Sequence, residues 1–224
     1  MKSPRILIAD DHALVVEGFR RLLEPQFEIV GTAGDGREAV AKAKRSRPDV
    51  VIMDIAMPTL NGIDAARKIR ETLPQTRVLF LSMHSDPAYV EQAFQAGGAG
   101  FLLKRSAGTE LKQAIRDVMK GRFYLTPLME SSFAGQFLDG EFVGMKARRR
   151  GKTPSGLPRG LTPRQREVLQ LVAEGKAIKE IATILAISTK TVEFHKSRIM
   201  DRLGVRTTAE LTHYAMRQGL IFPG

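Results

Sequence analysis

The stretch "RILIADDHALVVEGFRRLL", residues 5–23, joins a short apolar run to a segment of helical period. The run "RILIA" (5–9) predicts a buried strand, and "HALVVEGFRRLL" (12–23) spaces its apolar residues as one face of a helix does. Two adjacent carboxylates, Asp10 and Asp11, lie between the two segments. A solvated turn would explain this pair of like charges, and so would a bound cation. This stretch alone leaves both explanations open.

The same strand-then-helix unit recurs along the first 120 residues. Apolar runs follow at "EIVGTA" (28–33), "DVVIMDI" (49–55), "RVLFLSM" (77–83) and "GFLLK" (100–104), with helix-like segments after them. Some of these runs are almost continuously apolar, as strands covered on both faces are. The alternation predicts an α/β fold, a doubly wound five-stranded parallel sheet with helices on both faces.

Two changes of pattern divide the chain into three parts. From about residue 121 the sequence mixes Gly, Pro, Ser and basic residues, which is typical of a linker. After residue 160 four helical segments follow, and the first has Thr162 as N-cap, Pro163 at the first helical position and Gln165 at the third. We therefore expect a first domain at 1–122, a linker at 123–158 and a small all-α domain at 159–224.

The composition limits the classes of function. The chain has no cysteine, which excludes disulfides and thiolate catalysis, and its four histidines form no His-Glu-x-x-His pattern, which disfavours a transition-metal enzyme. No apolar run reaches the length of a membrane span or of a signal peptide, so we expect a cytoplasmic protein with no membrane partner. The formal net charge is +11, and residues 127–224 hold 16 Lys and Arg against 9 Asp and Glu. This excess favours a polyanionic partner such as nucleic acid.

Chemically active residues stand where the predicted strands end. Asp10 and Asp11 follow the first strand, Asp54 ends the third, Ser82 ends the fourth and Lys104 ends the fifth. The carboxyl ends of parallel strands share one edge of the sheet, so these side chains should converge there. Carboxylates that repel one another are stabilised by a hard cation, of which Mg²⁺ is the usual one. Beside it, Asp54 could attack phosphorus, with Lys104 and Ser82 stabilising the phosphoryl oxygens.

The Asp-Asp pair, "MDIAMP", "LSMH" and "GAGFLLK" resemble, in this order and spacing, the receiver domain of two-component response regulators over residues 4–122. The resemblance implies a flavodoxin-like sheet of order 2-1-3-4-5 and phosphoryl transfer to Asp54 from a phosphohistidine on a sensor kinase. It also implies that Mg²⁺ is held by Asp10, Asp11, Asp54 and the backbone carbonyl of Ala56, and that Ser82, Phe101 and Lys104 are the phosphoryl-binding and switch positions. Ala56 and Phe101 depart from the polar side chain and the Tyr of other members, which affects phosphoryl lifetime.

The helical segment "STKTVEFHKSRIMDRLG" (188–204) begins with Ser188 as N-cap and ends at Gly204. Its apolar residues, with Val192 and Ile199 among them, fall on one face, while an exposed Phe194 on the other face could contact a thymine methyl group. After a short helix and a tight turn, this arrangement is a helix-turn-helix. The expected DNA contacts are Lys190, Thr191, Glu193, Phe194, Lys196, Ser197 and Arg198. A helical bundle with a merely solvated positive face is the alternative.

The segments "LTPRQREVLQLVAEG", "KEIATILAIS", "KTVEFHKSRIMDRLGV" and "TTAELTHYAM" closely resemble the LuxR-type DNA-binding domain over residues 160–220. One departure is Ala177, which stands where that family commonly has a capping Ser and should leave the second helix slightly frayed. Together with a receiver, the chain resembles the NarL/FixJ class of response regulators.

The predicted function is therefore that of a transcriptional regulator and not of an enzyme. The resemblance implies phosphorylation at Asp54 by a sensor histidine kinase, Mg²⁺ as cofactor and a homodimer on double-stranded DNA when phosphorylated, with RNA polymerase as a further candidate partner. Two alternatives stay open. The receiver could be a passive dimerisation domain, or the chain could be a phosphohydrolase with a basic anchoring domain.

Overall fold

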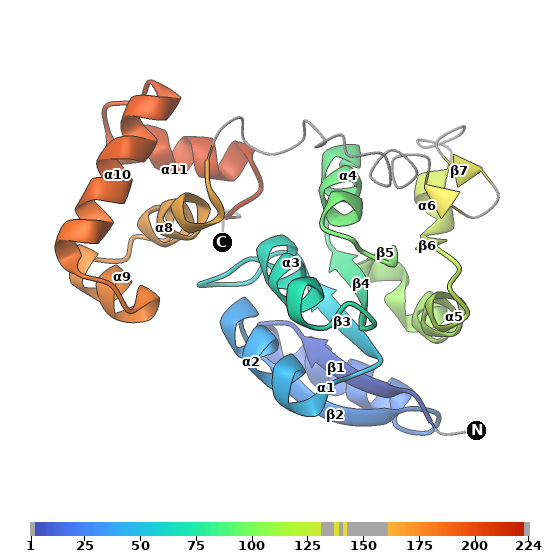
Figure 1. Cartoon of the computed structure of the whole chain (residues 1–224). Coiled ribbons are helices and arrows are strands. Elements are labelled where there is room, and N and C mark those ends of the chain that lie inside the picture. The colour runs from blue at the N-terminus through green and yellow to red at the C-terminus, as the bar shows by residue number, and fades with distance from the viewer. Residues whose placement is uncertain (1–2, 131–136, 139–140, 143–160, 222–224) are drawn as a thin grey trace. The chain divides into compact units, whose positions relative to one another are not determined.

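The computed structural model describes residues 3–130, 137–138, 141–142 and 161–221, and it divides the chain into two compact units (Figure 1). The first unit is an α/β sheet structure, and the second is a helical bundle. Most of the expected linker, with its basic run at 148–152, lies outside the described residues. Among the helices that are described, none has the length and apolar character needed to cross a bilayer.

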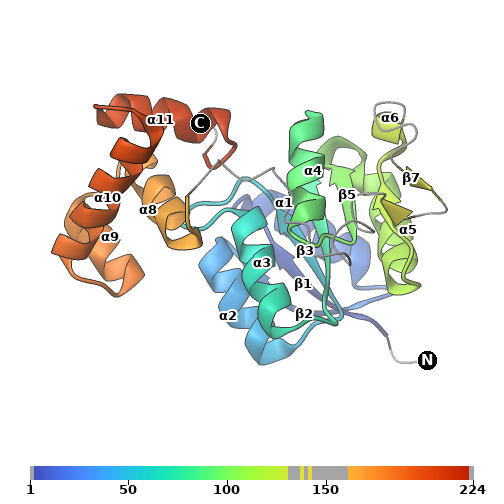
Figure 2. The same ribbon diagram turned by 45° about the horizontal axis from the view of Figure 1, so that its top comes forward.

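The first unit is a parallel sheet with the strand order β2-β1-β3-β4-β5-β6. Figure 2 labels β1, β2, β3 and β5 of this sheet. The predicted order 2-1-3-4-5 is confirmed, and one short strand is added at the edge. The elements are β1 Arg5–Ala9, α1 Ala13–Leu23, β2 Glu28–Ala33, α2 Gly36–Ser46, β3 Val50–Asp54, α3 Gly62–Thr72, β4 Arg77–Ser82, α4 Pro87–Gln95, β5 Gly100–Leu103, a 3₁₀ turn Lys104–Ser106, α5 Ala107–Met119 and β6 Tyr124–Leu125.

The added strand β6 continues the sheet beyond β5. Tyr124 pairs with Gly100 and Leu125 with Phe101, both in parallel register. The hydroxyl of Thr126 then accepts a hydrogen bond from the backbone N–H of Leu103 at 3.1 Å, so a side chain satisfies a donor at the end of the ladder. Beyond it lie α6 Pro127–Glu130 and an antiparallel pair of two-residue strands, β7 Phe137–Leu138 and β8 Glu141–Phe142.

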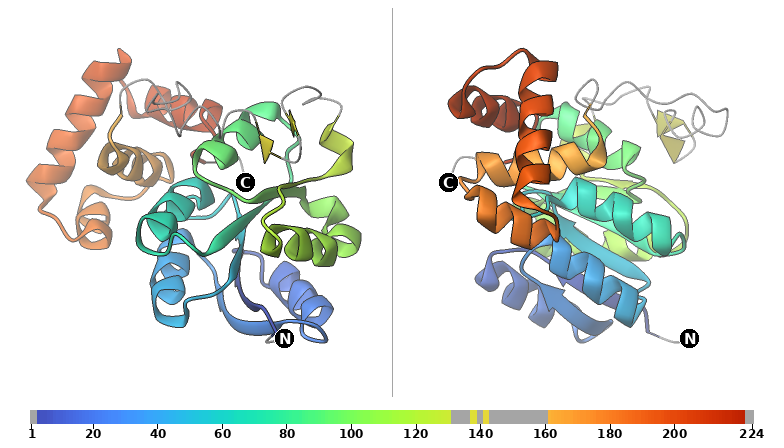
Figure 3. Two further views of the ribbon diagram at one scale, coloured as in Figure 1. Left: turned by 45° about the vertical axis from the view of Figure 1, so that its right-hand side comes forward. Right: turned by 60° about the vertical axis from the view of Figure 1, so that its left-hand side comes forward.

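The inner strands β1, β3, β4 and β5 are almost completely buried because helices cover both faces of the sheet (Figure 3). Every residue of β3 is buried, and the side chains of neighbouring strands align in register, with Ile8 opposite Ile52 and Ile52 opposite Leu79. Alternate strand residues pack against α1 and α5 in one continuous apolar cluster. The parallel sheet thereby brings the carboxyl ends of β1, β3, β4 and β5 to one edge.

The second unit is a four-helix bundle with its own apolar core. Its helices are α8 Pro163–Ala173, α9 Ile178–Leu185, α10 Thr189–Leu203 and α11 Thr208–Arg217. The capping box expected at Thr162 and Gln165 is present, with the two reciprocal hydrogen bonds at 3.2 and 2.9 Å. The tight turn between α9 and α10 passes through Ala186 in the left-handed conformation (φ 51°). Helices α9 and α10 therefore form the predicted helix-turn-helix.

Candidate functional site

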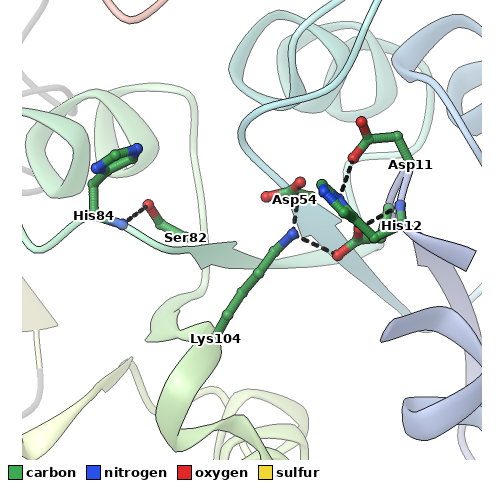
Figure 4. Close-up of polar contacts among 7 residues, drawn as sticks. Asp11, His12, Asp54, Ser82, His84 and Lys104 are labelled. Atoms are coloured by element: carbon green, nitrogen blue, oxygen red, sulfur yellow. Dashed lines mark hydrogen bonds and ion pairs between the residues drawn. The ribbon is translucent and has the colours of Figure 1, made fainter. Parts of the chain in front are cut away.

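An acidic cluster lies at the carboxyl edge of the sheet (Figure 4). Asp10 directly follows β1, and Asp54 is the last residue of β3. Both are almost completely buried, with 2% and 1% of their surface exposed, whereas Asp11 is exposed. A buried carboxylate is stable only beside a counter-charge, so this pair requires a cation nearby.

Lys104 supplies one such charge from the end of β5. Its Nζ atom lies 2.8 Å from Oδ2 of Asp10 and 2.8 Å from Oδ2 of Asp54. Burial lowers the pKa of Lys104, but the two carboxylates raise it more, so its pKa lies above the usual value and the amine stays charged. One ammonium between two buried carboxylates leaves an excess of one negative charge.

The pKa of Asp54 reflects this environment. Burial is the largest cause and raises the pKa of Asp54 above its usual value, against the opposing effect of Lys104. Asp10 raises this pKa further, while a hydrogen bond from the backbone N–H of Ala56 lowers it. The site therefore holds more negative charge than its own side chains neutralise.

The position of Asp54 depends on a close approach of the backbone at Gly62. The N–H of Gly62 donates to the carbonyl of Ile55 at 3.0 Å, which brings the start of α3 against the end of β3. A Cβ atom at Gly62 would lie 1.9 Å from the backbone oxygen of Asp54. Any residue other than glycine would displace the strand end, so Gly62 fixes where the Asp54 carboxylate sits.

The donor set of the cluster fits a divalent cation. Asp10, Asp11 and Asp54 each offer a carboxylate oxygen within 4.8 Å of those of the others. The Oδ2 atoms of Asp10 and Asp54 are fully buried, and the Lys104 ammonium approaches each of them to 2.8 Å. Oxygen ligands at this spacing, with excess negative charge, are what a hard divalent ion binds.

Two of the predicted site residues lie apart from this cluster. The hydroxyl of Ser82, at the end of β4, accepts a hydrogen bond from the backbone N–H of His84 at 3.0 Å and belongs to its own loop (Figure 4). Phe101 is fully buried in β5, in register with Phe80 of β4. In this arrangement the structure brings Asp10, Asp11, Asp54 and Lys104 together, while Ser82 and Phe101 flank them on neighbouring strands.

His12 belongs to the same cluster, although no role was predicted for it from the sequence. Its Nδ1 atom lies 2.8 Å from Oδ1 of Asp11 and 3.2 Å from Oδ1 of Asp10. The backbone N–H of His12 also donates to Oδ1 of Asp10 at 2.9 Å. Its position in the sequence, directly after the Asp-Asp pair, could have indicated this. A turn that brings two carboxylates close together also brings the next side chain near them.

The second unit presents α10 as a candidate nucleic-acid interface. The Ser188 hydroxyl caps its first turn by accepting from the N–H of Thr191 at 3.1 Å. Val192 and Ile199 are buried in the bundle, which fixes the opposite face of the helix outward. Of the predicted DNA contacts, Lys190, Glu193, Phe194, Ser197 and Arg198 are exposed, and Thr191 and Lys196 are half-buried. Lys196, one turn after Val192, lies beside the buried face of the helix and not opposite it.

Side-chain contacts preorganise part of this face. Phe194 is 55% exposed, and the guanidinium carbon of Arg198, one turn later, lies 5.2 Å from the centre of its ring. A cation over an aromatic face is attracted to it, so this pair holds an apolar surface and a positive charge side by side. Lys196 donates to the hydroxyl of Thr208 at 3.0 Å. This face of α10 therefore combines positive charge with an apolar side chain that is exposed to water.

Comparison with known proteins assigns both units to families. Residues 6–116 match the response regulator receiver domain, and residues 159–215 match the bacterial regulatory proteins of the luxR family. The oxygen regulatory protein NreC of Staphylococcus carnosus (strain TM300) is 40% identical over 220 residues, which cover 97% of this chain and 99% of NreC.

Solved structures show the same relationship. The RcsB response regulator of Salmonella typhimurium is 28% identical with a TM-score of 0.62, covering 97% of this chain and 99% of that one. A two-component response regulator of the LuxR family from Aurantimonas sp. SI85-9A1 is 38% identical with a TM-score of 0.57, covering 59% of this chain and 96% of that one. RcsB in complex with DNA is 28% identical with a TM-score of 0.55, covering 95% of this chain and 98% of that one.

The α/β unit with its acidic cluster and the helix-turn-helix unit thus define a class of phosphorylation-dependent transcription factors. The chain belongs to the two-component response regulators that join a receiver domain to a LuxR-type DNA-binding domain. It is a DNA-binding regulator of transcription and not an enzyme, and its receiver implies a kinase partner.

Proposed function

We propose that Asp54 is the phosphoacceptor of this regulator and that a sensor histidine kinase supplies the phosphoryl group. The observation that supports this role is the position of the Asp54 carboxylate: it ends β3, is 1% exposed, and faces an ammonium 2.8 Å away. In the transfer, an Asp54 oxygen attacks phosphorus, a P–O bond forms, and the P–N bond to the kinase imidazole breaks. The imidazole leaves with the bonding electron pair and takes up a proton.

Asp11, Asp54 and the backbone carbonyl of Ala56 would hold Mg²⁺, with Asp10 assisting from its buried position. Bound Mg²⁺ supplies positive charge for the phosphoryl oxygens and for the carboxylates. Lys104 and Ser82 would orient the incoming phosphoryl group. Lys104 already contacts Asp54 and is placed to form an ion pair with the new phosphoryl group, and the Ser82 hydroxyl can turn from its loop to donate to one phosphoryl oxygen.

The same movements would carry the signal from the site to the surface. The phosphoryl group adds a charge of about −1.5 to −2. When Ser82 turns toward it, the β4–α4 loop loses the hydrogen bond from His84 to Ser82 and can shift. Phe101, on the adjacent strand, then has a second packing position available to it. The receiver acts as a two-state element, and phosphorylation favours the state that forms homodimers.

The activated dimer would bind a two-half-site operator in double-stranded DNA with one α10 helix in each major groove. In this proposal Lys190 would contact guanine or phosphate, Glu193 would contact cytosine, and Phe194 would contact a thymine methyl group. Thr191, Lys196 and Arg198 would contact phosphates, and Ser197 would make either class of contact. Bound RNA polymerase would be a further partner at the promoter.

The first test is phosphoryl uptake by the full chain with Mg²⁺ and a small phosphodonor such as acetyl phosphate. We expect about one label per chain in the wild type, none in Asp54→Asn, and none in the presence of a chelator, because a single carboxylate accepts the group beside a metal. The matched control is Asp49→Asn, since Asp49 is exposed at the opposite end of β3 and should leave uptake unchanged.

The labelled protein should also dimerise and bind operator DNA more tightly than the unlabelled protein. Equal labelling of Asp54→Asn and wild type would refute the assignment of Asp54. Equal DNA binding by both proteins, with and without phosphodonor, would show instead that the receiver is a passive dimerisation domain. Release of many phosphates per chain would indicate a phosphohydrolase.

A further inference from the structure

His12 places a nitrogen atom at the edge of the acidic cluster. Its Nδ1 lies between two carboxylate oxygens, 2.8 Å from Asp11 and 3.2 Å from Asp10. Carboxylate oxygens only accept hydrogen bonds, and an unprotonated ring nitrogen also only accepts. Such an atom is stable at this point only when a proton or a metal ion lies between it and the oxygens.

The spacing of these atoms suits ligands of a single ion. Metal-ligand bonds of about 2.1 Å place neighbouring ligands of an octahedral ion about 3.0 Å apart and opposite ligands about 4.2 Å apart. The Nδ1 to oxygen distances of 2.8 and 3.2 Å bracket the first value. One ligand atom from each of Asp10, Asp11, His12 and Asp54 lies within 4.8 Å of all the others, so the four atoms are gathered around one point.

The ring is also accessible to an incoming ion. The His12 side chain is 65% exposed and that of Asp11 is 32% exposed, whereas the Asp10 side chain is fully buried beneath them. A hydrated ion can thus exchange waters for the two outer ligands before it reaches the inner carboxylates. Mg²⁺ is bound by oxygen ligands and exchanges its waters reluctantly, whereas imidazole suits transition ions such as Fe²⁺, Ni²⁺ and Zn²⁺.

We propose that His12 Nδ1 is a direct ligand for a divalent first-row transition ion in the receiver site, and that it gives this site a preference for such ions over Mg²⁺. The inference rests on the proposed metal site of Asp10, Asp11 and Asp54 and extends it by one ligand. The receiver would then be loaded according to the supply of Fe²⁺ or a similar transition ion as well as of Mg²⁺. In the absence of metal, a proton on Nδ1 makes the same contacts.

The test uses Mn²⁺ as the probe, bound to the full chain without a histidine tag. Pulsed electron paramagnetic resonance of bound Mn²⁺ detects modulation from a coordinated ¹⁴N nucleus. We expect this modulation in the wild type and its complete loss in His12→Ala. The matched control is His213→Ala, an exposed histidine on α11 in the other unit, which should retain it.

Competition between Ni²⁺ and Mg²⁺ gives a second readout. Ni²⁺, which imidazole suits better than it suits Mn²⁺, gives the larger effect: in His12→Ala the preference for Ni²⁺ over Mg²⁺ should fall by about tenfold, while Mg²⁺ affinity should change by less than about twofold because its ligands are oxygens. Nitrogen modulation that is absent in the wild type, or that persists in His12→Ala, would overturn the role of His12.

The measurements distinguish a wrong role for His12 from a wrong assignment of the whole metal site. If Mn²⁺ and Mg²⁺ bind and Asp54 accepts its label, but no nitrogen signal appears, the phosphoacceptor site stands and only His12 is removed from it. If neither ion binds to wild type or variants and no label is taken up, the metal site itself is refuted, together with the inference built on it.

Discussion

Lys104 is the residue on which the stability of the acidic cluster depends. Its side chain is 8% exposed, and its ammonium is the counter-charge that the described residues place against both Asp10 and Asp54. Two buried carboxylates without that charge would repel each other in a medium that screens charge poorly. The same ammonium occupies the side of the cluster that faces β5, so an added cation must bind on the exposed side, near Asp11.

Replacing Lys104 by Met should destabilise the receiver most when divalent ions are absent. Loss of one partner from a buried charge pair lowers the free energy of unfolding by about 3–5 kcal/mol, because the remaining charges are left uncompensated. Added Mg²⁺ should stabilise Lys104→Met more than it stabilises the wild type, since the ion then provides the missing charge. Urea unfolding of the full chain, with Mg²⁺ and with a chelator, measures both effects.

The control for this variant is Arg105→Met, since Arg105 is the exposed neighbour in the same turn. It should change stability by less than about 0.5 kcal/mol. A second variant, Lys104→Met with Asp54→Asn, should recover part of the loss because it removes one of the two repelling charges. Equal stability of Lys104→Met and Arg105→Met would show that the buried ion pairs contribute nothing.

The residues of the acidic cluster could be predicted from the sequence because their positions follow from topology alone. Asp10, Asp54 and Lys104 each sit at the end of a parallel strand, and such ends share one edge. The direction of the Ser82 hydroxyl and the approach of the His12 ring could not be predicted in this way. They depend on loop backbone and side-chain rotamers, which the alternation of apolar and polar residues does not determine.

At the scale of the helix, the second unit has one helix, α9, whose N-cap differs from the others. Thr162, Ser188 and Thr207 each accept a hydrogen bond from the first turn of the helix that follows. At α9 the N-cap is Ala177, which has no acceptor on its side chain, and the remaining contact is its own N–H donating to Glu180 at 2.7 Å. Half of a capping box is therefore present.

Ala177→Ser should complete that box. The backbone at Ala177 (φ −67°, ψ 152°) matches that at Ser188 (φ −72°, ψ 153°), so a serine can adopt the capping rotamer without backbone change. The substitution should stabilise α9 by about 1 kcal/mol. Native-state hydrogen exchange of amides in the first turn of α9 should slow about fivefold, which corresponds to that energy.

The reciprocal variant, Ser188→Ala, should destabilise α10 by about 1 kcal/mol, since it removes the bond to the N–H of Thr191. Amides of the receiver should exchange at unchanged rates in both variants. Faster exchange of α9 in Ala177→Ser would mean that the present turn is already the more stable arrangement.

Other elements show where prediction from sequence ends. The long apolar runs of β1, β3 and β4 and the capped helices α8 and α10 match their expected places, because each carries a pattern several residues long. The two-residue strand β6 falls in the expected linker, since two residues show no period. Its pairing depends on a neighbour, β5, that exposes a free edge to it.

At the scale of the whole molecule, the candidate binding sites of the two units carry opposite charges. The receiver places buried acidic groups at a point where a cation and a phosphoryl group meet, whereas the DNA-binding helix presents Lys and Arg to a polyanion. Residues 127–224 hold the larger share of the net charge of +11, with 16 basic against 9 acidic residues. Affinity for DNA should therefore depend strongly on salt.

That dependence tests both the contact made by Lys190 and the number of chains on the DNA. A lysine that neutralises one phosphate contributes about 0.9 to the slope of log affinity against log salt concentration. Lys190 is exposed in the first turn of α10, so it is free to reach a backbone phosphate. If the phosphorylated protein binds as a dimer, Lys190→Ala removes two such contacts, and the slope should become shallower by about 1.8. If the protein binds as a monomer, Lys190→Ala removes one contact and the slope should become shallower by about 0.9.

Lys196→Ala should also weaken binding and make the slope shallower if the Lys196 ammonium, which donates to the Thr208 hydroxyl, contacts a phosphate as proposed. Lys44→Ala on α2 is the matched control, because it removes the same charge from an exposed helix of the receiver and should leave the slope unchanged. The slopes come from fluorescence anisotropy titrations with operator DNA at several salt concentrations. Suppose instead that Lys190→Ala leaves the slope unchanged and weakens binding to operator DNA but not to other DNA. Lys190 would then contact a base edge, since base contacts carry specificity and release no counterions.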